Sequence, residues 1–399
     1  MKPNVSKTMI LIAVILMDLL AGMEFDLFVP SFPELQTQFN LSPFLVEALL
    51  SINFIGFCLS LFFVGSLADR YGRKPIITLG LTIFIIGTIL CLWGSTYLFL
   101  IMGRFLQGVG IAAPAILSFL IIADLYSLKK QQYLMAMLNG LMNASVGAAP
   151  IIGSYITLYF HWQGNFIALL LLSLFTFIIT LLFIPAVKRP EIKETLSWRG
   201  YIPLFKSRPM VLLMVFISVN YVPYWVFVGM SPLLYIKDLH VSLSYFGYYQ
   251  GVLALVCAIG SIAFGFILNK FDQKKMLYIA GCIFFASLIS IAVVTIQNSH
   301  NPLLITLAFL PFIIGQIIPG IILYPLCLNF MPQAKGRVSA VLQGTRLILC
   351  ALSLQVAGFY YTGSFQNIGI IIASFIFIVV ITFFLVTKNH ALMKRLYEH

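Results

Sequence analysis

The sequence predicts an all-α membrane protein with twelve transmembrane helices in two pseudo-symmetric six-helix bundles. Composition is the first reason: of 399 residues, 61% are hydrophobic and only 9% are charged, whereas soluble proteins carry about 25% charged residues. The second reason is that twelve mostly apolar runs reach or exceed the roughly 20 residues that a bilayer-spanning helix needs. The third is a short basic loop that recurs, in degraded form, in the second half of the chain.

The twelve apolar runs follow one another with short polar breaks between them. In chain order they cover residues 8–29, 44–66, 76–95, 97–124, 133–160, 162–186, 210–235, 243–268, 276–297, 302–330, 337–361 and 366–387. A polar segment rich in Lys, Arg and Pro separates the sixth run from the seventh. We therefore expect an N-terminal six-helix bundle at 1–187, a cytoplasmic linker at 188–209 and a C-terminal six-helix bundle at 210–399.

The positive residues predict the orientation of the spans. If the N-terminus is cytoplasmic, then of the 24 Lys and Arg only Arg104, Lys237 and Arg346 fall outside the cytoplasmic segments. This is the positive-inside rule, and it predicts that both termini are cytoplasmic. It also accounts for the net charge of +12 without nucleic acid as a partner. The basic linker can contact anionic membrane lipids as well, although a cytoplasmic stop signal explains it more simply.

Several classes of protein are disfavoured by what the sequence lacks. A cleaved signal peptide does not fit the first run, which has no A-x-A-like site and carries Asp18, Glu24 and Asp26. The six cysteines lie inside predicted spans without C-x-x-C spacing, so neither a disulfide nor a metal site is indicated. No nucleotide-binding or hydrolase motif occurs, so we expect no enzyme and no cofactor, with a proton gradient as the energy source.

The repeated basic loop is the most informative motif. It reads G-S-L-A-D-R-Y-G-R-K-P at 65–75 and G-F-I-L-N-K-F-D-Q-K-K at 265–275. The second copy has Asn269 where the first has Asp69. A basic cytoplasmic loop repeated once per half is typical of a transporter built from two halves.

These motifs resemble the major facilitator superfamily over essentially the whole chain. The first loop matches the family's signature with Gly65, Asp69, Arg70, Gly72, Arg73 and Lys74. A second motif, R-x-x-Q-G-x-G, begins at Arg104, and a third keeps Pro150 and Gly153 of a glycine-rich antiporter motif. The first-span ending F-D-L-F-V-P-S-F-P and the loop H-W-Q-G-N-F are similar to the Bcr/CflA branch of drug:proton antiporters. That branch implies a bacterial inner (cytoplasmic) membrane.

In the resembled family the first loop acts as a conformational latch. Asp69 can accept hydrogen bonds at a neighbouring helix N-terminus, and Arg70 or Arg73 can pair with Asp124 at the inner end of the fourth span. Such contacts exist in only one arrangement and so bias a two-state equilibrium. The simpler alternative, that the basic residues only set topology, does not require Asp69 or the glycines Gly65 and Gly72.

Acidic residues in the first span are the proton-coupling candidates. An ionised Asp at the bilayer centre costs roughly 2.5–3.5 kcal/mol, so Asp18 needs an explanation, and burial favours its neutral form. On an ideal helix Asp18 and Asp26 are about 80° apart and can face one cavity, whereas Glu24 points about 200° away from Asp26. Asp18 and Asp26 are therefore the first candidates for proton coupling, and Glu24 is the second choice. Structural pairing is the alternative role.

Two arginines lie inside predicted spans. Arg104 is about 10 Å deep by helical rise and needs a carboxylate or carbonyl partner, which the first-span acids can supply. The resembled family implies proton coupling for it; a structural ion pair is the alternative. Arg346 lies about 14 Å deep from the inside. It can pair with Asp18, bind an anionic group of the substrate, or form an interior structural pair.

Polar and aromatic side chains inside spans are candidate substrate contacts, because aromatic walls with few charges suit amphipathic or aromatic ligands. Packing or helix–helix hydrogen bonding is the simpler role for each one. The candidates, with Arg346, are Asn53, Asn143, Asn220, Tyr221, Tyr224 and Trp225.

The sequence therefore favours a proton-coupled secondary transporter, acting as a monomer, that exports a small amphipathic or aromatic compound by alternating access. Two alternatives stay open. One is uptake or exchange of an anionic metabolite or siderophore, suggested by Arg346. The other is a membrane receptor on the same fold that binds a ligand without transporting it.

Overall fold

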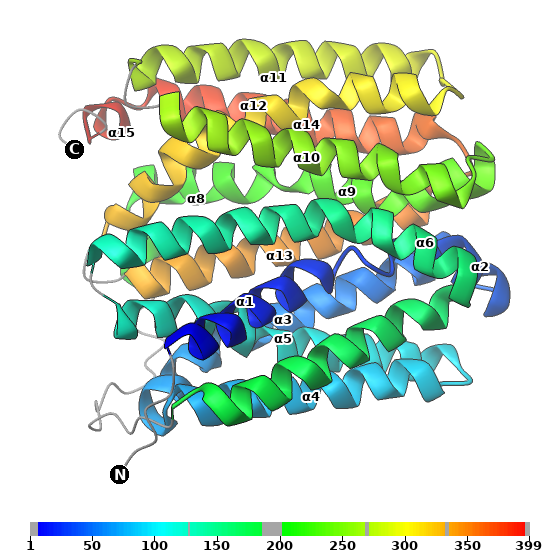
Figure 1. Ribbon diagram of the computed structural model, residues 1–399. Coiled ribbons are helices and arrows are strands. Elements are labelled where there is room, and N and C mark those ends of the chain that lie inside the picture. The colour runs from blue at the N-terminus through cyan, green and yellow to red at the C-terminus, as the bar shows by residue number, and fades with distance from the viewer. Residues whose placement is uncertain (1–6, 127, 186–201, 268–270, 332–334, 396–399) are drawn as a thin grey trace. The chain divides into compact units, whose positions relative to one another are not determined.

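The computed structural model describes residues 7–126, 128–185, 202–267, 271–331 and 335–395. These residues form helices joined by short loops, and no strand occurs among them (Figure 1). The chain divides into two compact units. Unit 1 is Met1–Leu196 with Phe246–Gly251, and unit 2 is Ser197–Tyr245 with Val252–His399.

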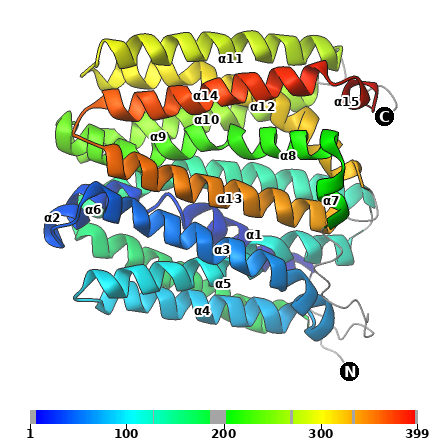
Figure 2. The ribbon, with the colours of Figure 1, turned by 180° about the vertical axis from the view of Figure 1, so that it is seen from behind.

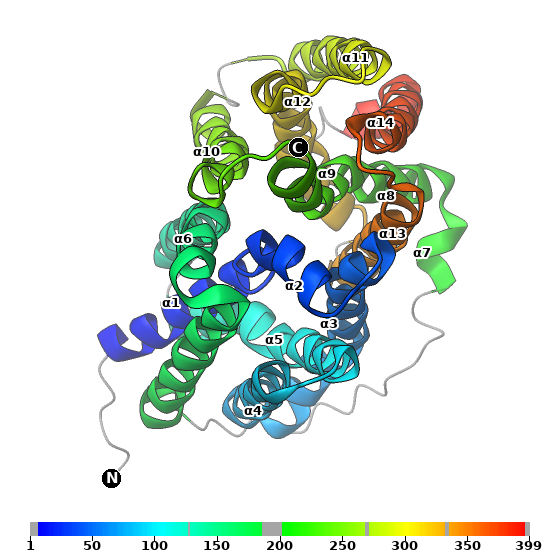
Figure 3. The same cartoon turned by 90° about the vertical axis from the view of Figure 1, so that its right-hand side faces the viewer.

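Unit 1 begins with α1 (Lys7–Met23), followed by a 3-10 turn η1 (Val29–Ser31) and the short α2 (Phe32–Gln38). The long helices α3 (Pro43–Tyr71), α4 (Arg73–Trp93), α5 (Tyr97–Leu125) and α6 (Leu128–Phe183) complete it. Within the unit α4 lies along α5, α5 lies along α3, and α1 packs on α6 (Figure 3).

The boundaries of these helices follow from local sequence. Ser42 accepts a hydrogen bond from the backbone N–H of Leu45, and Pro43 stands at the first helical position, which together start α3. Gly72 separates α3 from α4 with a φ of 92°, a value that L-residues with side chains rarely adopt. His161 interrupts α6 with a φ of 57°, so this segment is two helices meeting at a kink.

Unit 2 is also helical, and it combines long helices with several short ones. It contains α7 (Ile202–Lys206), α8 (Arg208–Asn220), α9 (Val222–Pro232), the π-helical turn η3 (Leu233–Asp238), most of α10 (Leu243–Ile267), α11 (Gln273–Ile296), α12 (Pro302–Asn329), α13 (Lys335–Tyr360), α14 (Phe365–Lys388) and α15 (His390–Arg395). Within the unit α11 packs on α12 and α14, and α13 packs on α8 and α9 (Figure 2).

Ten helical segments among the described residues are long and apolar enough to cross a membrane. One of them, Gly140–Phe183, contains the kink at His161 and accounts for two predicted spans. The remaining predicted span is α1, which has 17 residues. The predicted all-α membrane fold with twelve spans is therefore confirmed.

Two sequence-based boundaries need comment. The first apolar run was expected to be helical over 8–29, but α1 ends at Met23, and Pro30 and Pro33 each begin a new short helix after it. The predicted linker at 188–209 lies mostly outside the described residues; its last part forms α7 and the start of α8. Part of the second loop copy also lies outside them.

Close backbone contact holds α3 against α5. A Cβ atom added to Gly108 would lie 2.1 Å from the carbonyl oxygen of Asn53, closer than real Cβ atoms approach. The contacted atom belongs to the backbone and cannot rotate away. Gly108 therefore fixes the spacing of the two helices that carry the buried site described next.

Candidate functional site

A buried ion pair lies inside unit 1. Arg104 on α5 places its Nη1 2.9 Å from Oε1 of Glu24, and both side chains are fully buried. The guanidinium also lies over the ring of Phe28, with Cζ 4.1 Å from the ring centroid. The pair is thus enclosed by protein at a depth where bulk water does not screen it.

Polar neighbours on three helices support this pair. Asn53 on α3 donates from Nδ2 to Glu24 Oε1 at 2.6 Å and to the carbonyl oxygen of Arg104 at 3.0 Å. Arg104 donates from Nη1 to Gln107 Oε1 at 2.7 Å, and Gln107 donates from Nε2 to Thr88 Oγ1 at 2.8 Å. The R-x-x-Q spacing places both side chains on one face of α5, since residues three apart are neighbours on a helix.

The acidic partner of Arg104 is Glu24, one of the first-span acids that the sequence predicted for this role. Glu24 was the second choice after Asp18 and Asp26, because an ideal helix turns it away from Asp26. The helix ends at Met23, so the angle of 100° per residue does not apply to Glu24. The chain continues as a turn, which directs Glu24 to Arg104.

Asp18 and Asp26 are also buried, each with 1% of its surface exposed. Within the described part of the chain, neither oxygen of Asp26 has a hydrogen-bond partner, and Oδ2 of Asp18 lacks one as well. Among the described residues, Oε2 of Glu24 and Nη2 of Arg104 also have no hydrogen-bond partner. Unit 1 therefore holds three buried first-segment acids, of which Glu24 is the one paired with the arginine.

The sequence interpretation missed a fourth buried acid, Glu47, one turn into α3. Its side chain is fully buried, and neither carboxyl oxygen has a hydrogen-bond partner among the described residues. The signal was available, since Glu47 is the one charged residue of the predicted run at 44–66.

The latch loop forms one of the expected ion pairs. Arg73 Nη2 lies 2.9 Å from Asp124 Oδ2, linking the start of α4 to the end of α5. Arg70 instead lies over the ring of Tyr71, with Cζ 5.2 Å from its centroid. Asp69 is exposed near the end of α3. Gly72 supplies the sharp turn, whereas a Cβ on Gly65 would meet no atom of the described residues within 4 Å.

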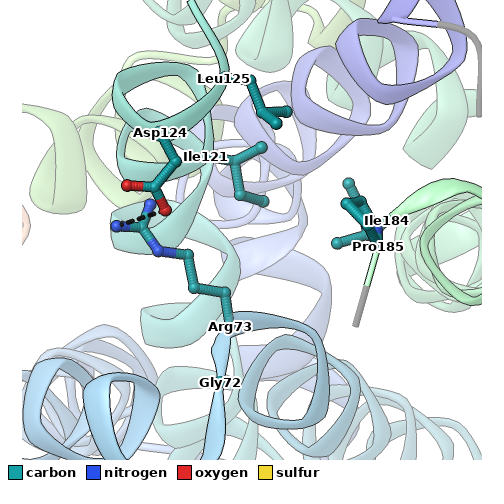
Figure 4. A pocket seen from close by; sticks show the side chains of 7 residues that line it. All are labelled: Gly72, Arg73, Ile121, Asp124, Leu125, Ile184 and Pro185. Carbon is teal, nitrogen blue, oxygen red and sulfur yellow. Dashed lines mark ion pairs between the residues drawn. The ribbon is translucent and has the colours of Figure 1, made fainter. Parts of the chain in front are cut away.

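A cavity of about 320 Å³ lies beside this ion pair. Figure 4 shows Arg73 and Asp124 joined on one side, with the apolar side chains of Ile121, Ile184 and Pro185 around the space. The end of α6 therefore meets the latch at the same place, inside unit 1.

The candidate substrate residues separate into three groups. Asn53 belongs to the ion-pair cluster described above. The side chain of Asn143 lies outside the described part of the structure. The remaining ones lie in unit 2, around the break between α8 and α9, and are Asn220, Tyr221, Tyr224, Trp225 and Arg346.

That unit 2 group combines aromatic rings with one cation. Arg346 Cζ lies 4.4 Å from the ring centroid of Tyr221. The rings of Tyr224 and Trp225 meet edge to face with centroids 5.7 Å apart. Asn220 is buried at the end of α8. The break between the two helices thus presents polar and aromatic groups at mid-span.

The fold and the buried charges define an integral membrane protein of the secondary-transporter class. A family model described as Major Facilitator Superfamily matches residues 14–354. The chain belongs to this superfamily, and it is a transport protein of the inner membrane, not an enzyme.

Curated relatives and solved structures agree. The chain is 25% identical over 337 residues to "Multidrug resistance protein MdtL" of Shewanella oneidensis, covering 84% of each chain. It is 29% identical over 280 residues to the protein of the same name in Escherichia fergusonii, covering 67% of this chain and 68% of that protein.

Two solved structures share the fold. A D-xylose-proton symporter has a TM-score of 0.76 at 14% identity, covering 94% of this chain and 97% of that one. A bacterial homologue of the human lysosomal transporter Spinster has a TM-score of 0.74 at 16% identity, covering 98% of each chain.

Proposed function

We propose that this transporter exports small amphipathic or aromatic compounds in exchange for protons, by alternating access. It works as a monomer, with both termini in the cytoplasm and the proton gradient as its energy source. Relatives named as multidrug resistance proteins support export. The observation that carries proton coupling is the fully buried Glu24–Arg104 ion pair.

This ion pair links protonation to conformation. A proton on Glu24 removes the negative charge that compensates Arg104, and the guanidinium is then left buried without a counter-ion. An uncompensated buried charge is strongly unfavourable, so the arrangement that buries the pair becomes less stable. Protonation therefore shifts the population toward an arrangement that solvates or re-pairs Arg104.

Asp18 and Asp26 extend the same scheme along the first segment. Both are buried, and each has at least one oxygen without a hydrogen-bond partner in the described ranges; an isolated ionised carboxylate is costly in that environment. In this proposal they exchange protons with Glu24 or with water when the surrounding helices move. Substrate binding and proton binding then favour different states, which is the requirement for exchange.

The Arg73–Asp124 latch contributes a conformational bias to the proposed transport cycle. It joins α4 to α5 in the present arrangement of unit 1. The ion pair stabilises only the arrangement in which it forms. It therefore shifts the conformational equilibrium toward that arrangement without contacting the substrate.

Transport by purified protein in liposomes tests the proposal. With an imposed proton gradient, the parent protein concentrates an aromatic substrate against its gradient, whereas Glu24→Gln, Asp18→Asn and Asp26→Asn lose this uphill transport. Exchange of labelled for unlabelled substrate, which needs no gradient, serves as the control for folded protein. If all three variants still transport uphill, the proton-coupling assignment is wrong.

A further inference from the structure

We infer that Arg346 forms an anion-binding subsite, so that preferred substrates carry a carboxylate or a similar acidic group beside an aromatic or apolar part. This inference rests on the proposed export function and names the chemical class of its substrate. It concerns unit 2 alone.

Arg346 lies well inside the membrane span of α13. Helical rise places it about 16 Å from Lys335 and about 21 Å from Tyr360, the two ends of that helix. Its guanidinium stacks on Tyr221, and its buried Nε has no hydrogen-bond partner among the residues that the structure describes. An aromatic face stabilises a cation but leaves its charge and its N–H donors available.

Unit 2 offers this arginine no counter-ion among the described residues. Its described acids are Asp238 and Asp272, at the ends of helices. Asp238 accepts a hydrogen bond from Tyr361, and Asp272 caps α11 by accepting from the backbone N–H of Lys274 at 2.8 Å. Unit 1 differs, because its buried arginine has Glu24.

The chemistry around Arg346 fits an organic anion with a ring. A guanidinium presents a planar fork of donors that matches a carboxylate or phosphate in a two-point contact. Tyr221 already holds the guanidinium plane, so fewer rotamers are lost when the anion binds. Tyr224 and Trp225, one turn further along α9, add aromatic surface of the kind that binds a ring.

A matched pair of probes tests this subsite by calorimetry on the purified full chain. Naphthalene-2-carboxylate and naphthalene-2-carboxamide share a ring system and differ in charge. We expect the parent protein to bind the carboxylate at least about tenfold more tightly, as a charge-assisted hydrogen bond allows. Arg346→Gln removes this preference while its affinity for the carboxamide stays unchanged, and Arg346→Lys keeps part of it.

Lys388→Gln is the matched control, because Lys388 also lies over an aromatic ring of unit 2, that of Phe384, at 4.3 Å. It retains the full preference. The proposal is overturned if the parent fails to bind the carboxylate, if it binds both probes equally, or if Arg346→Gln retains the preference.

A further experiment tests whether the counter-charge of Arg346 comes from the substrate or from an acid of this chain. A double-mutant cycle of thermal stability with Asp18→Asn and Arg346→Gln should be additive. Strong coupling in that cycle, together with equal affinity for both probes, assigns the counter-charge to the protein and overturns the inference.

The transport assay separates this inference from the proposed function. Carboxylate preference without uphill export leaves the anion subsite standing and removes the proton-coupled exporter. Uphill export of neutral or cationic aromatic compounds, with no carboxylate preference, supports the proton-coupled exporter and overturns the anion subsite.

Discussion

Glu24 and Arg104 form an ion pair in which neither side chain is exposed, with 2.9 Å between Oε1 and Nη1. Because removing one partner of such a pair leaves the other charge buried, we expect Glu24→Ala to destabilise the protein by about 3–5 kcal/mol. Adding Arg104→Met should recover most of the lost stability, since neither position of the ion pair then carries a charge. Thermal unfolding in detergent measures both, and a double variant less stable than Glu24→Ala would contradict this account.

Glu47 should behave in the opposite way. It is buried and has no hydrogen-bond partner among the described residues, so replacing it by the neutral isostere in Glu47→Gln removes no observed hydrogen bond. We expect the thermal unfolding midpoint to stay the same or rise. If the unfolding midpoint fell as far as that of Glu24→Ala, this expectation would be wrong, because the Glu47 carboxylate would then make a stabilising contact.

Loss of the latch should open the inner end of unit 1. The Arg73–Asp124 pair is partly exposed, with 12% and 35% of the two side chains accessible, so its contribution is at most about 1 kcal/mol. In a background with Ile184→Cys, which places a thiol in the adjoining cavity, Asp124→Asn should raise the maleimide labelling rate two- to fivefold. The charge exchange Arg73→Asp with Asp124→Arg should restore slow labelling. Equal rates in all three proteins would exclude a latch.

Gly108→Ala should separate α3 from α5. The new methyl group meets the Asn53 carbonyl oxygen, which cannot move without the helix, so we expect a loss of about 1–3 kcal/mol and less folded protein in the membrane. Gly320→Ala on α12 is the matched control, because no atom of the described residues lies within 4 Å of its added Cβ. Size-exclusion profiles and unfolding midpoints should distinguish the two variants.

Tyr361 predicts a stability change at high pH. Burial, and then the hydrogen bond to Asp238 and its charge, raise the pKa of Tyr361 above its usual range. A group whose pKa is raised on folding contributes stability below its unfolded pKa, about 10 for Tyr, and loses that contribution as pH rises further. The parent should therefore unfold at a higher temperature than Tyr361→Phe at pH 8, and this advantage should shrink above pH 10. Tyr360→Phe, at an exposed neighbour, should show no such trend.

The sequence predicted the helical fold well because each span is a long apolar run with a clear stop. The break between 160 and 162 is an example, since the structure places the kink at His161. The end of the first span was predicted too late, because hydrophobicity continues through Phe28 and Val29 after the helix has ended. Pro30 and Pro33 were the signals against a continuous helix.

The site was predicted less completely, because partners depend on contacts far apart in sequence. Arg104 was expected to need a first-span acid, but choosing Glu24 required the geometry of a turn. The pairing of Arg346 with Tyr221 joins residues of α13 and the α8–α9 break, and no local pattern indicates it. Packing between distant helices supplied this information.

The mid-span position of Arg346 also bears on the electrical balance of transport. One monovalent anion leaving the cell while one proton enters transfers two charges in the same electrical sense. The membrane potential, negative inside, then adds about 2.3 kcal/mol per charge for every 100 mV, on top of the pH difference. An exporter of such anions would continue to work at alkaline external pH, where an electroneutral exchanger stalls.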